Sequence, residues 1–343
     1  MENLKKIIWQ SPSNIAVVKY WGKYVSQIPM NPSLSFTLNQ CYTETKIEYS
    51  FEGSGEINFY YNDQINQAFG IKVKKYIHSL NLSFLQNLDL HINSFNTFPH
   101  SAGIASSASA MSALALCLTS LEDLIQNAKR DICEFKTRAS YLARLGSGSA
   151  SRSIFPKASI WGKVESIPFS SDLFGIDWSQ QLGSEFQAIQ DWIFLVSSSE
   201  KSVSSSQGHQ LMENHVFRNS RIEQANENIL KIIHAIKNND WELFIDVCEE
   251  EALTLHGLMM SSRPSYILLA PDSLKIIQSI KQFRKENNIP VTFTIDAGPN
   301  IHMLFDKKYE KQVQEFCESE WSEYLLQGKI LKDQMGEGPI QTT

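Results

Sequence analysis

The feature that most constrains the fold is the stretch of residues 96–118, where a loop of small polar residues turns directly into an alanine-rich helix. Pro99 and Gly103 bend the backbone just before that helix. The residues that open the helix are small, so an anion can approach the unpaired N–H groups of the first turn, where the helix dipole favours negative charge. These residues are Ala105, Ser106, Ser107 and Ala108. The stretch therefore predicts a phosphate cradle, in which serine hydroxyls add ligands for phosphate or Mg²⁺.

This loop differs from the best-known nucleotide-binding loops. It has no Gly-Lys-Ser/Thr ending, so it is not a Walker-type P-loop, and it lacks the three-glycine dinucleotide fingerprint. A simple serine-capped helix explains the same residues, because serine is a preferred cap and alanine is the best helix former. Both interpretations stay open for this stretch considered alone.

The length and the charge of the chain limit the class of protein. A chain of 343 residues predicts about two domains. We expect a boundary near residue 185, which gives domains at 1–185 and 186–343. A hydrophobic content of 42% with 20% charged residues is typical of a globular protein. The net charge of −6 argues against a general nucleic-acid surface, so any phosphate site must be local.

The cysteines and the apolar runs indicate the compartment. The five cysteines are scattered and form no Cys-x-x-Cys pair, and the eight histidines form no ligand pattern. No segment approaches the ~18 apolar residues of a membrane span, and no long apolar run follows the first residues. We therefore expect a cytoplasmic protein with no membrane partner, no nucleic-acid partner and no metal site built from protein ligands.

The apolar periodicity predicts a mixed α+β chain. Residues 7–20 predict two short strands separated by a turn, because apolar runs flank Ser-Pro-Ser-Asn. Helices are expected over about 104–121, 124–145, 211–237, 241–260, 272–287 and 307–323. Further strands are expected near 88–94, 191–197, 290–296, 301–305 and 330–333.

Three other places carry side chains suited to chemistry. Lys19 and Lys23 follow an apolar strand, although surface lysines often extend along apolar surface in the same way. The Gly-Ser-Gly-Ser run at 146–149 is either a flexible linker or a second anion cradle. Flanking apolar structure and the planar fork of Arg152 favour the cradle. Asp296 ends an apolar strand, where it either caps a turn or orients an alcohol for phosphoryl transfer.

The phosphate loop, Pro-x-x-x-Gly-Ile-x-Ser-Ser-Ala, resembles the phosphate-binding motif of the GHMP kinase superfamily. Residues 11–23, 146–152 and 294–300 look like the signature blocks of one family within it, the diphosphomevalonate decarboxylases. The resemblance spans the chain. It implies a two-domain GHMP kinase-like fold, with an N-terminal ribosomal protein S5-like domain, a C-terminal ferredoxin-like domain and the site in the cleft.

The resemblance also implies an activity. ATP would phosphorylate the 3-hydroxyl of mevalonate 5-diphosphate, after which phosphate and CO₂ leave to give isopentenyl diphosphate. Mg²⁺ would enter with ATP, because phosphates and water supply most of its ligands. A homodimer is implied as well, because relatives commonly dimerise.

Residue roles carry over by position. Asp296 would orient or deprotonate the 3-hydroxyl, Arg152 would hold the C1 carboxylate, and Lys19 would stabilise charge beside Asp296. The residues implied to bind the substrate are Tyr20, Lys23, Ser147, Gly148, Ser149, Ser204 and Ser205, and Lys201 is a further candidate. The residues implied to bind ATP are Asn96, Pro99, Ser101, Gly103, Ala105, Ser106, Ser107 and Ala108.

Some positions depart from the family pattern. Tyr24-Val25 stands where the family often has Arg-Asp, Ser206 where some members have arginine, and His209 where methionine is usual. The 5-substituent of the substrate therefore stays open. One alternative is a related decarboxylase or 3-kinase that acts on mevalonate 5-phosphate or on mevalonate. Another is a non-catalytic small-molecule sensor with the same fold, although the presence of Lys19, Arg152 and Asp296 speaks against it.

Overall fold

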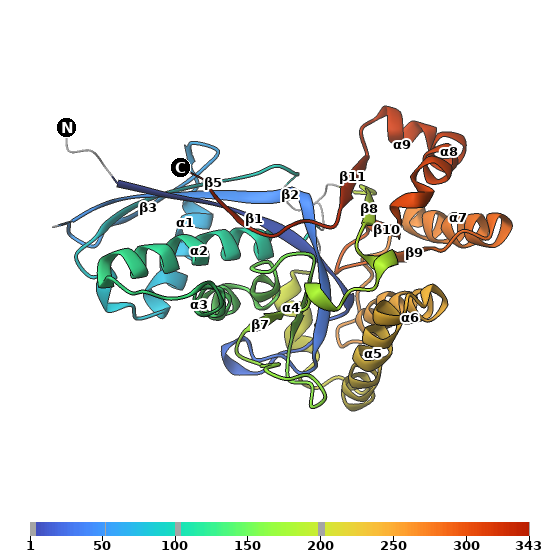
Figure 1. The fold of residues 1–343 in the computed structure, drawn as a ribbon, viewed down its shortest axis with the longest axis horizontal. Coiled ribbons are helices and arrows are strands. Elements are labelled where there is room, and N and C mark those ends of the chain that lie inside the picture. Colours follow the sequence, from blue (N-terminus) through green and yellow to red (C-terminus); the bar gives the residue numbers. More distant parts are fainter. Residues whose placement is uncertain (1–4, 52, 100–103, 198–202, 343) are drawn as a thin grey trace.

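The computed structural model describes residues 5–51, 53–99, 104–197 and 203–342, and it consists of two sheets with helices packed against them (Figure 1). The strands of the first sheet are β1 (Lys5–Val18), β2 (Ser33–Ser50), β3 (Ile57–Tyr61), β4 (Gln64–Ile65), β5 (Asp89–Asn96), β6 (Ala158–Trp161), β7 (Gly175–Asp177) and β12 (Ile340–Thr342). Their order is β12-β1-β2-β5-β3-β4, with β6 attached to β2 and β7 attached to β6. The last strand of the chain thus returns to pair with the first.

The helices of this half are α1 (Gln67–Ser79), α2 (Ser106–Gln126) and α3 (Ile132–Gly146). Short 3₁₀ turns lie at η1 (Val25–Gln27), η2 (Ser83–Leu85), η3 (Gly148–Arg152), η4 (Ser179–Gln181) and η5 (Ser184–Phe186). Helix α2 packs between α3 and strands β1 and β2, and Leu118 and Leu121 on it are fully buried. Burial of each such leucine side chain stabilises the folded state by roughly 1.5–3 kcal/mol.

By length and composition α2 is apolar enough to cross a membrane, which the sequence analysis did not anticipate. In the folded chain 67% of the apolar 18-residue stretch of this helix is buried. Packing in the core therefore accounts for its apolar surface.

The second sheet is antiparallel, with the order β11-β8-β10-β9. Its strands are β8 (Ile189–Phe194), β9 (Val291–Thr294), β10 (Ile301–Asp306) and β11 (Ile330–Gln334). The helices of this half are α4 (Ser205–Leu211), α5 (Arg218–Asn238), α6 (Trp241–Met260), α7 (Pro271–Asn287), α8 (Glu310–Glu320) and α9 (Ser322–Leu326), with a 3₁₀ turn at η6 (Lys307–Tyr309). The α+β prediction is confirmed, and the division at residue 185 stays a prediction.

Three local predictions are wrong. The helix expected at 211–237 begins only at Arg218, because α4 ends at Leu211 and a turn separates the two. Residues 7–20 do not form two strands, because β1 continues through Pro12 with a register shift between Pro12 and Asn14. Such a bulge absorbs the missing N–H of proline and lets the strand go on. The expected helix at 124–145 is also displaced, since α2 runs on to Gln126 and α3 begins at Ile132. A capping box of Asp131 and Glu134 determines where α3 starts.

The two sheets are held together directly. The carboxylate of Asp333 on β11 accepts hydrogen bonds from the backbone N–H groups of Asn39, Gln40 and Cys41 on β2, at 2.9, 2.9 and 2.8 Å. One apolar core also contains residues from both halves, including Phe36. The ends of β1 and β9 also lie next to each other, since the hydroxyl of Thr294 donates to the carbonyl of Ala16 at 3.2 Å. The residues that follow these two strand ends supply the site described next.

Candidate active site

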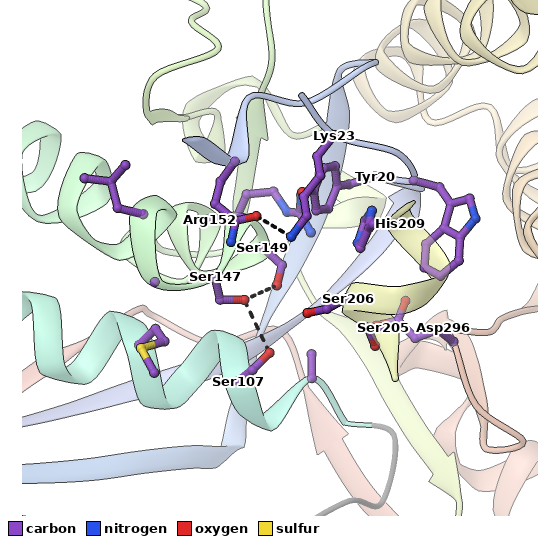
Figure 2. Close-up of a pocket in the computed structure, with 18 of the residues that line it drawn as sticks. Tyr20, Lys23, Ser107, Ser147, Ser149, Arg152, Ser205, Ser206, His209 and Asp296 are labelled. Carbon is purple, nitrogen blue, oxygen red and sulfur yellow. Dashed lines mark hydrogen bonds between the residues drawn. The ribbon is translucent and has the colours of Figure 1, made fainter. Parts of the chain in front are cut away.

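A cavity of about 660 Å³ lies where the two halves meet (Figure 2). Its wall is formed by the segment after β1, the first turn of α2, the loop from α3 to η3, helix α4 and the turn after β9. The predicted site residues that line it are Lys19, Tyr20, Lys23, Ala105, Ser107, Ser147, Gly148, Ser149, Arg152, Ser205 and Asp296.

Lys19 and Asp296 form an ion pair at the cavity wall, with 2.8 Å between Nζ and Oδ1. They lie 277 positions apart in the chain. The side chain of Lys19 is 2% exposed, whereas that of Asp296 is 26% exposed. The ammonium therefore supports the carboxylate from the buried side, and the carboxylate remains accessible to a ligand.

The backbone around this pair is anchored by charged side chains behind it. Glu251 accepts a hydrogen bond from the backbone N–H of Lys19 at 2.8 Å, and Arg221 donates to the carbonyl of Lys19 at 2.9 Å. Arg221 and Glu251 pair with each other at 2.6 Å and are almost fully buried. The ring of His256 donates from Nε2 to the carbonyl of Asp296 at 3.1 Å. Sequence reasoning missed these three residues, which lie in helices with no motif around them.

Arg152 is a buried guanidinium held by neutral groups. It donates from Nη1 to the Ser33 hydroxyl at 2.6 Å, and from Nε to the Ser35 hydroxyl at 3.0 Å and to Asn14 at 3.3 Å. Burial lowers its pKa to about 10, so it stays protonated at neutral pH. In the part of the chain that the structure describes, no carboxylate forms an ion pair with it. A buried cation in this state is stabilised by an incoming anion.

The two predicted anion cradles meet at their serines. The hydroxyl oxygens of Ser107 and Ser147 are 3.3 Å apart, and those of Ser147 and Ser149 are 3.4 Å apart (Figure 2). Ala105 precedes α2 in the left-handed region, with φ 43°, and its side chain cannot cap the helix. The first turn of α2 therefore keeps N–H groups for an external anion.

Glycine is required at position 148 because the side chain of Tyr20 lies too close to its backbone for any larger residue. A Cβ atom at this position would lie 2.8 Å from the hydroxyl oxygen of Tyr20. That hydroxyl is itself buried without a hydrogen-bond partner, and burial raises the pKa of Tyr20 well above its usual value. The Tyr20 hydroxyl is therefore protonated at neutral pH and lies against Gly148 of the η3 turn.

Some predicted residues do not line the cavity. Asn96 accepts a hydrogen bond from Thr43 at 2.8 Å, and Ser204 caps α4 by accepting from the N–H of Gln207 at 3.3 Å. Pro99, Ser106 and Ala108 are also absent from the cavity wall, and Ala108 is fully buried. Ser101, Gly103 and Lys201 lie outside the described residues. The predicted roles of all these residues stay predictions.

Other residues of the cavity were given no role from the sequence, and Ser206 and His209 were named there only as departures from the family pattern. Lys72 and Lys75 extend from α1, and Trp21, Ser206 and His209 also line the wall. The lysines had a recognisable signal, because positions i and i+3 share one face of a helix. The sequence signal at His209 was only its departure from the methionine that is usual there, since its neighbours show no ligand pattern.

The cavity is positively charged although the chain is acidic. Its basic lining residues are Lys19, Lys23, Lys72, Lys75 and Arg152, and Asp296 is the one acidic residue among the described residues that line it. Within the described ranges no group of three His, Cys, Asp or Glu side chains is placed to hold a metal ion. Ser107 provides a hydroxyl oxygen that suits a Mg²⁺ whose other ligands come mainly from phosphates and water. The cavity suits anionic ligands, and the carboxylate of Asp296 lies in its wall.

Two family models match the chain. The diphosphomevalonate decarboxylase-like N-terminal domain matches residues 11–172, and the mevalonate 5-diphosphate decarboxylase C-terminal domain matches residues 192–336. A diphosphomevalonate decarboxylase of Saccharomyces cerevisiae is 30% identical over 326 residues, which cover 88% of this chain and 78% of the relative.

Solved structures resemble this chain over nearly its whole length. Mevalonate diphosphate decarboxylase from Staphylococcus aureus superposes with a TM-score of 0.84 at 27% identity, covering 100% of this chain and 99% of that chain. The structure of MDDEF in complex with MVAPP, AMPPCP and magnesium has a TM-score of 0.82 at 28% identity, covering 98% of each chain. The likeness confirms the predicted two-domain GHMP kinase-like α+β fold.

Proposed function

Because the chain belongs to the diphosphomevalonate decarboxylase family, we propose that it uses ATP to decarboxylate mevalonate 5-diphosphate to isopentenyl diphosphate in the cavity described above. ATP is the co-substrate, and Mg²⁺ accompanies it. ADP, phosphate and CO₂ are the other products. The metal would neutralise charge on the phosphates, and the hydroxyl of Ser107 is an oxygen ligand available to it.

The observation that carries the proposal is the Lys19–Asp296 pair, which lines one cavity together with the buried Arg152. In the first step the 3-hydroxyl oxygen bonds to the γ-phosphorus of ATP while the bond from that phosphorus to ADP breaks. Asp296 orients the hydroxyl and accepts its proton, and Lys19 stabilises the negative charge beside it. Phosphoryl transfer of this kind depends on positioning and charge, which the pair and the cradles supply.

The second step separates charge in the substrate. The C3–O bond breaks and phosphate leaves with the electron pair, while the electrons of the C1–C2 bond form the new double bond and CO₂ departs. Arg152 holds the C1 carboxylate as an anion until then, because its guanidinium stays charged and has no carboxylate partner among the described residues. The carboxylate of the substrate thus becomes the counter-ion of Arg152, whose hydrogen bonds within the protein all go to neutral groups.

The decisive test is a substrate comparison. Purified protein is incubated with Mg·ATP and, separately, with mevalonate, its 5-phosphate and its 5-diphosphate, and the release of ADP and CO₂ is followed. We expect equal release of both with the 5-diphosphate and the highest kcat/KM for it. ADP without CO₂ would contradict the proposal in favour of a 3-kinase. No turnover of any mevalonate derivative would favour a non-catalytic sensor.

Arg152→Lys is expected to raise the KM for mevalonate 5-diphosphate by about tenfold or more, because lysine keeps the charge but loses the fork that binds a carboxylate through two bonds. The KM for ATP should change much less. Steady-state kinetics with each substrate varied in turn checks this. Equal rises in both KM values would contradict a specific hold on the carboxylate.

We further propose that the protein is a cytoplasmic homodimer, as the family resemblance implies. Its five cysteines are free thiols, four of them buried, which suits a reducing compartment. Light scattering should give about twice the 39.0 kDa of one chain. A monomer mass across the working concentration range would contradict the dimer.

A further inference from the structure

His209 is a cavity residue to which neither the motifs nor the mechanism gives a role. It lies on α4 with 8% of its surface exposed, and it lines the cavity next to Tyr20 (Figure 2). Its ring packs between the rings of Tyr20 and Trp21, with centroid distances of 4.4 and 4.6 Å. The two aromatic neighbours hold the imidazole in one orientation.

The backbone of Gly22 determines which ring nitrogen carries the hydrogen. Its N–H donates to Nδ1 of His209 at 2.9 Å, so Nδ1 is an acceptor and the neutral ring carries its hydrogen on Nε2. Burial, together with the positive charge of Lys23, lowers the pKa of His209 to about 3. At neutral pH the side chain is therefore an uncharged donor with a fixed tautomer.

The Nε2–H group has no acceptor among the residues that the structure describes, and it is not among their fully buried polar atoms, so it is open to the cavity that His209 lines. The hydroxyl of Tyr20, on the neighbouring ring, is buried without a partner. A ligand oxygen that carries negative charge would form a stronger hydrogen bond with Nε2–H than water does. Lys23 lies close enough to influence His209 electrostatically, and it lines the same cavity. A neutral donor of fixed orientation beside a lysine fits a group that consists of acceptors and negative charge, as a phosphate does.

We propose that His209 is a substrate-binding residue that donates its Nε2–H to a phosphate oxygen at the 5-end of the substrate. This inference rests on the proposed function, because it takes the 5-diphosphate of mevalonate as the ligand. Lys23 is a flexible point charge, whereas the imidazole is fixed by Gly22 and by two aromatic rings. His209 therefore orients the bound phosphate and favours a phosphorylated substrate over mevalonate itself.

Two substitutions separate this role from simple packing. His209→Asn places an amide oxygen near the position of Nδ1, so it keeps an acceptor for Gly22 but loses the group at Nε2. His209→Gln places an N–H donor near the position of Nε2. Gln210→Asn is the matched control, because Gln210 is the next residue of α4, is exposed and does not line the cavity.

The main readout is the Kd of mevalonate 5-diphosphate by titration calorimetry without nucleotide. We expect His209→Asn to raise this Kd and the substrate KM by about tenfold or more, as the loss of a hydrogen bond to a charged group should. The KM for ATP should change less than about threefold, His209→Gln should recover most of the loss, and Gln210→Asn should match the wild type.

Each contrary outcome has a distinct meaning. A wild-type protein that binds the 5-diphosphate but turns over no mevalonate derivative overturns the proposed function and leaves the Kd comparison valid. An unchanged Kd in His209→Asn overturns the inference about His209, whatever the wild-type activity. Equal losses in both His209 variants, accompanied by equal falls in melting temperature, also overturn it, because they assign the residue to packing alone.

Discussion

Asp296→Asn is expected to lower kcat by about 10²-fold or more, while the KM for ATP changes only a few-fold. Asparagine keeps the shape of the side chain but removes its negative charge and its basicity, which act mainly in the transition state. The charge of Lys19, at 2.8 Å from Oδ1 in the native protein, also loses its partner. Binding should therefore survive while turnover collapses.

The alternative role for Asp296, a turn-capping residue, predicts a different result. Asparagine caps the same turns, so the variant would at most melt at a lower temperature and would keep near-normal kcat. Asp306→Asn is the matched control, because Asp306 lies at the end of β10 and caps the following turn by accepting from the backbone N–H of Lys308, but does not line the cavity. Melting temperature and kcat are measured on one preparation of each variant. A folded Asp296→Asn protein with kcat near that of wild type would rule out the catalytic assignment.

Glu251→Gln is expected to lower the free energy of unfolding by about 3–5 kcal/mol, the usual cost of removing one partner from a buried ion pair. Glu251 is fully buried, and its carboxylate accepts from Arg221 at 2.6 and 2.7 Å. The amide leaves the guanidinium of Arg221 charged and without its counter-ion. Because Glu251 also accepts from the N–H of Lys19, the ordering of the Lys19–Asp296 pair should weaken as well.

Urea denaturation followed by circular dichroism measures this loss of stability. The neighbouring Glu250 provides the control, because its carboxylate is exposed and accepts hydrogen bonds from neutral amides, so Glu250→Gln should change the free energy of unfolding by less than about 1 kcal/mol. Equal effects of the two substitutions would show that the Arg221–Glu251 pair has no special importance for the fold.

The sequence alone predicted elements whose cause is local. The helix expected at 241–260 is α6 (Trp241–Met260), since an uninterrupted apolar periodicity specifies a helix without reference to the rest of the chain. The strands expected on either side of the Gly-Pro-Asn turn are β9 and β10, which pair antiparallel. The predictions at Pro12 and near residue 124 failed, because a bulge and a capping box outweighed the apolar pattern there.

The sequence also identified Lys19, Arg152 and Asp296 as a set, because each lies in a stretch that resembles a family motif. It gave no sign of the contacts that surround them. Glu251 reaches Lys19 across 232 positions, and His209 reaches Gly22 across 187 positions. No pattern in a sequence window connects residues so far apart.

What the sequence by itself determined is therefore the set of local elements and the motif residues, since backbone preferences and side-chain spacing act over a few neighbours. Only the tertiary structure decided which buried charges are paired and which ring nitrogen of His209 carries hydrogen. It also decided that Arg152 is buried without an ion pair among the described residues. These properties depend on burial and on the distances between atoms from different elements, because desolvation and hydrogen bonding act through space and not along the chain.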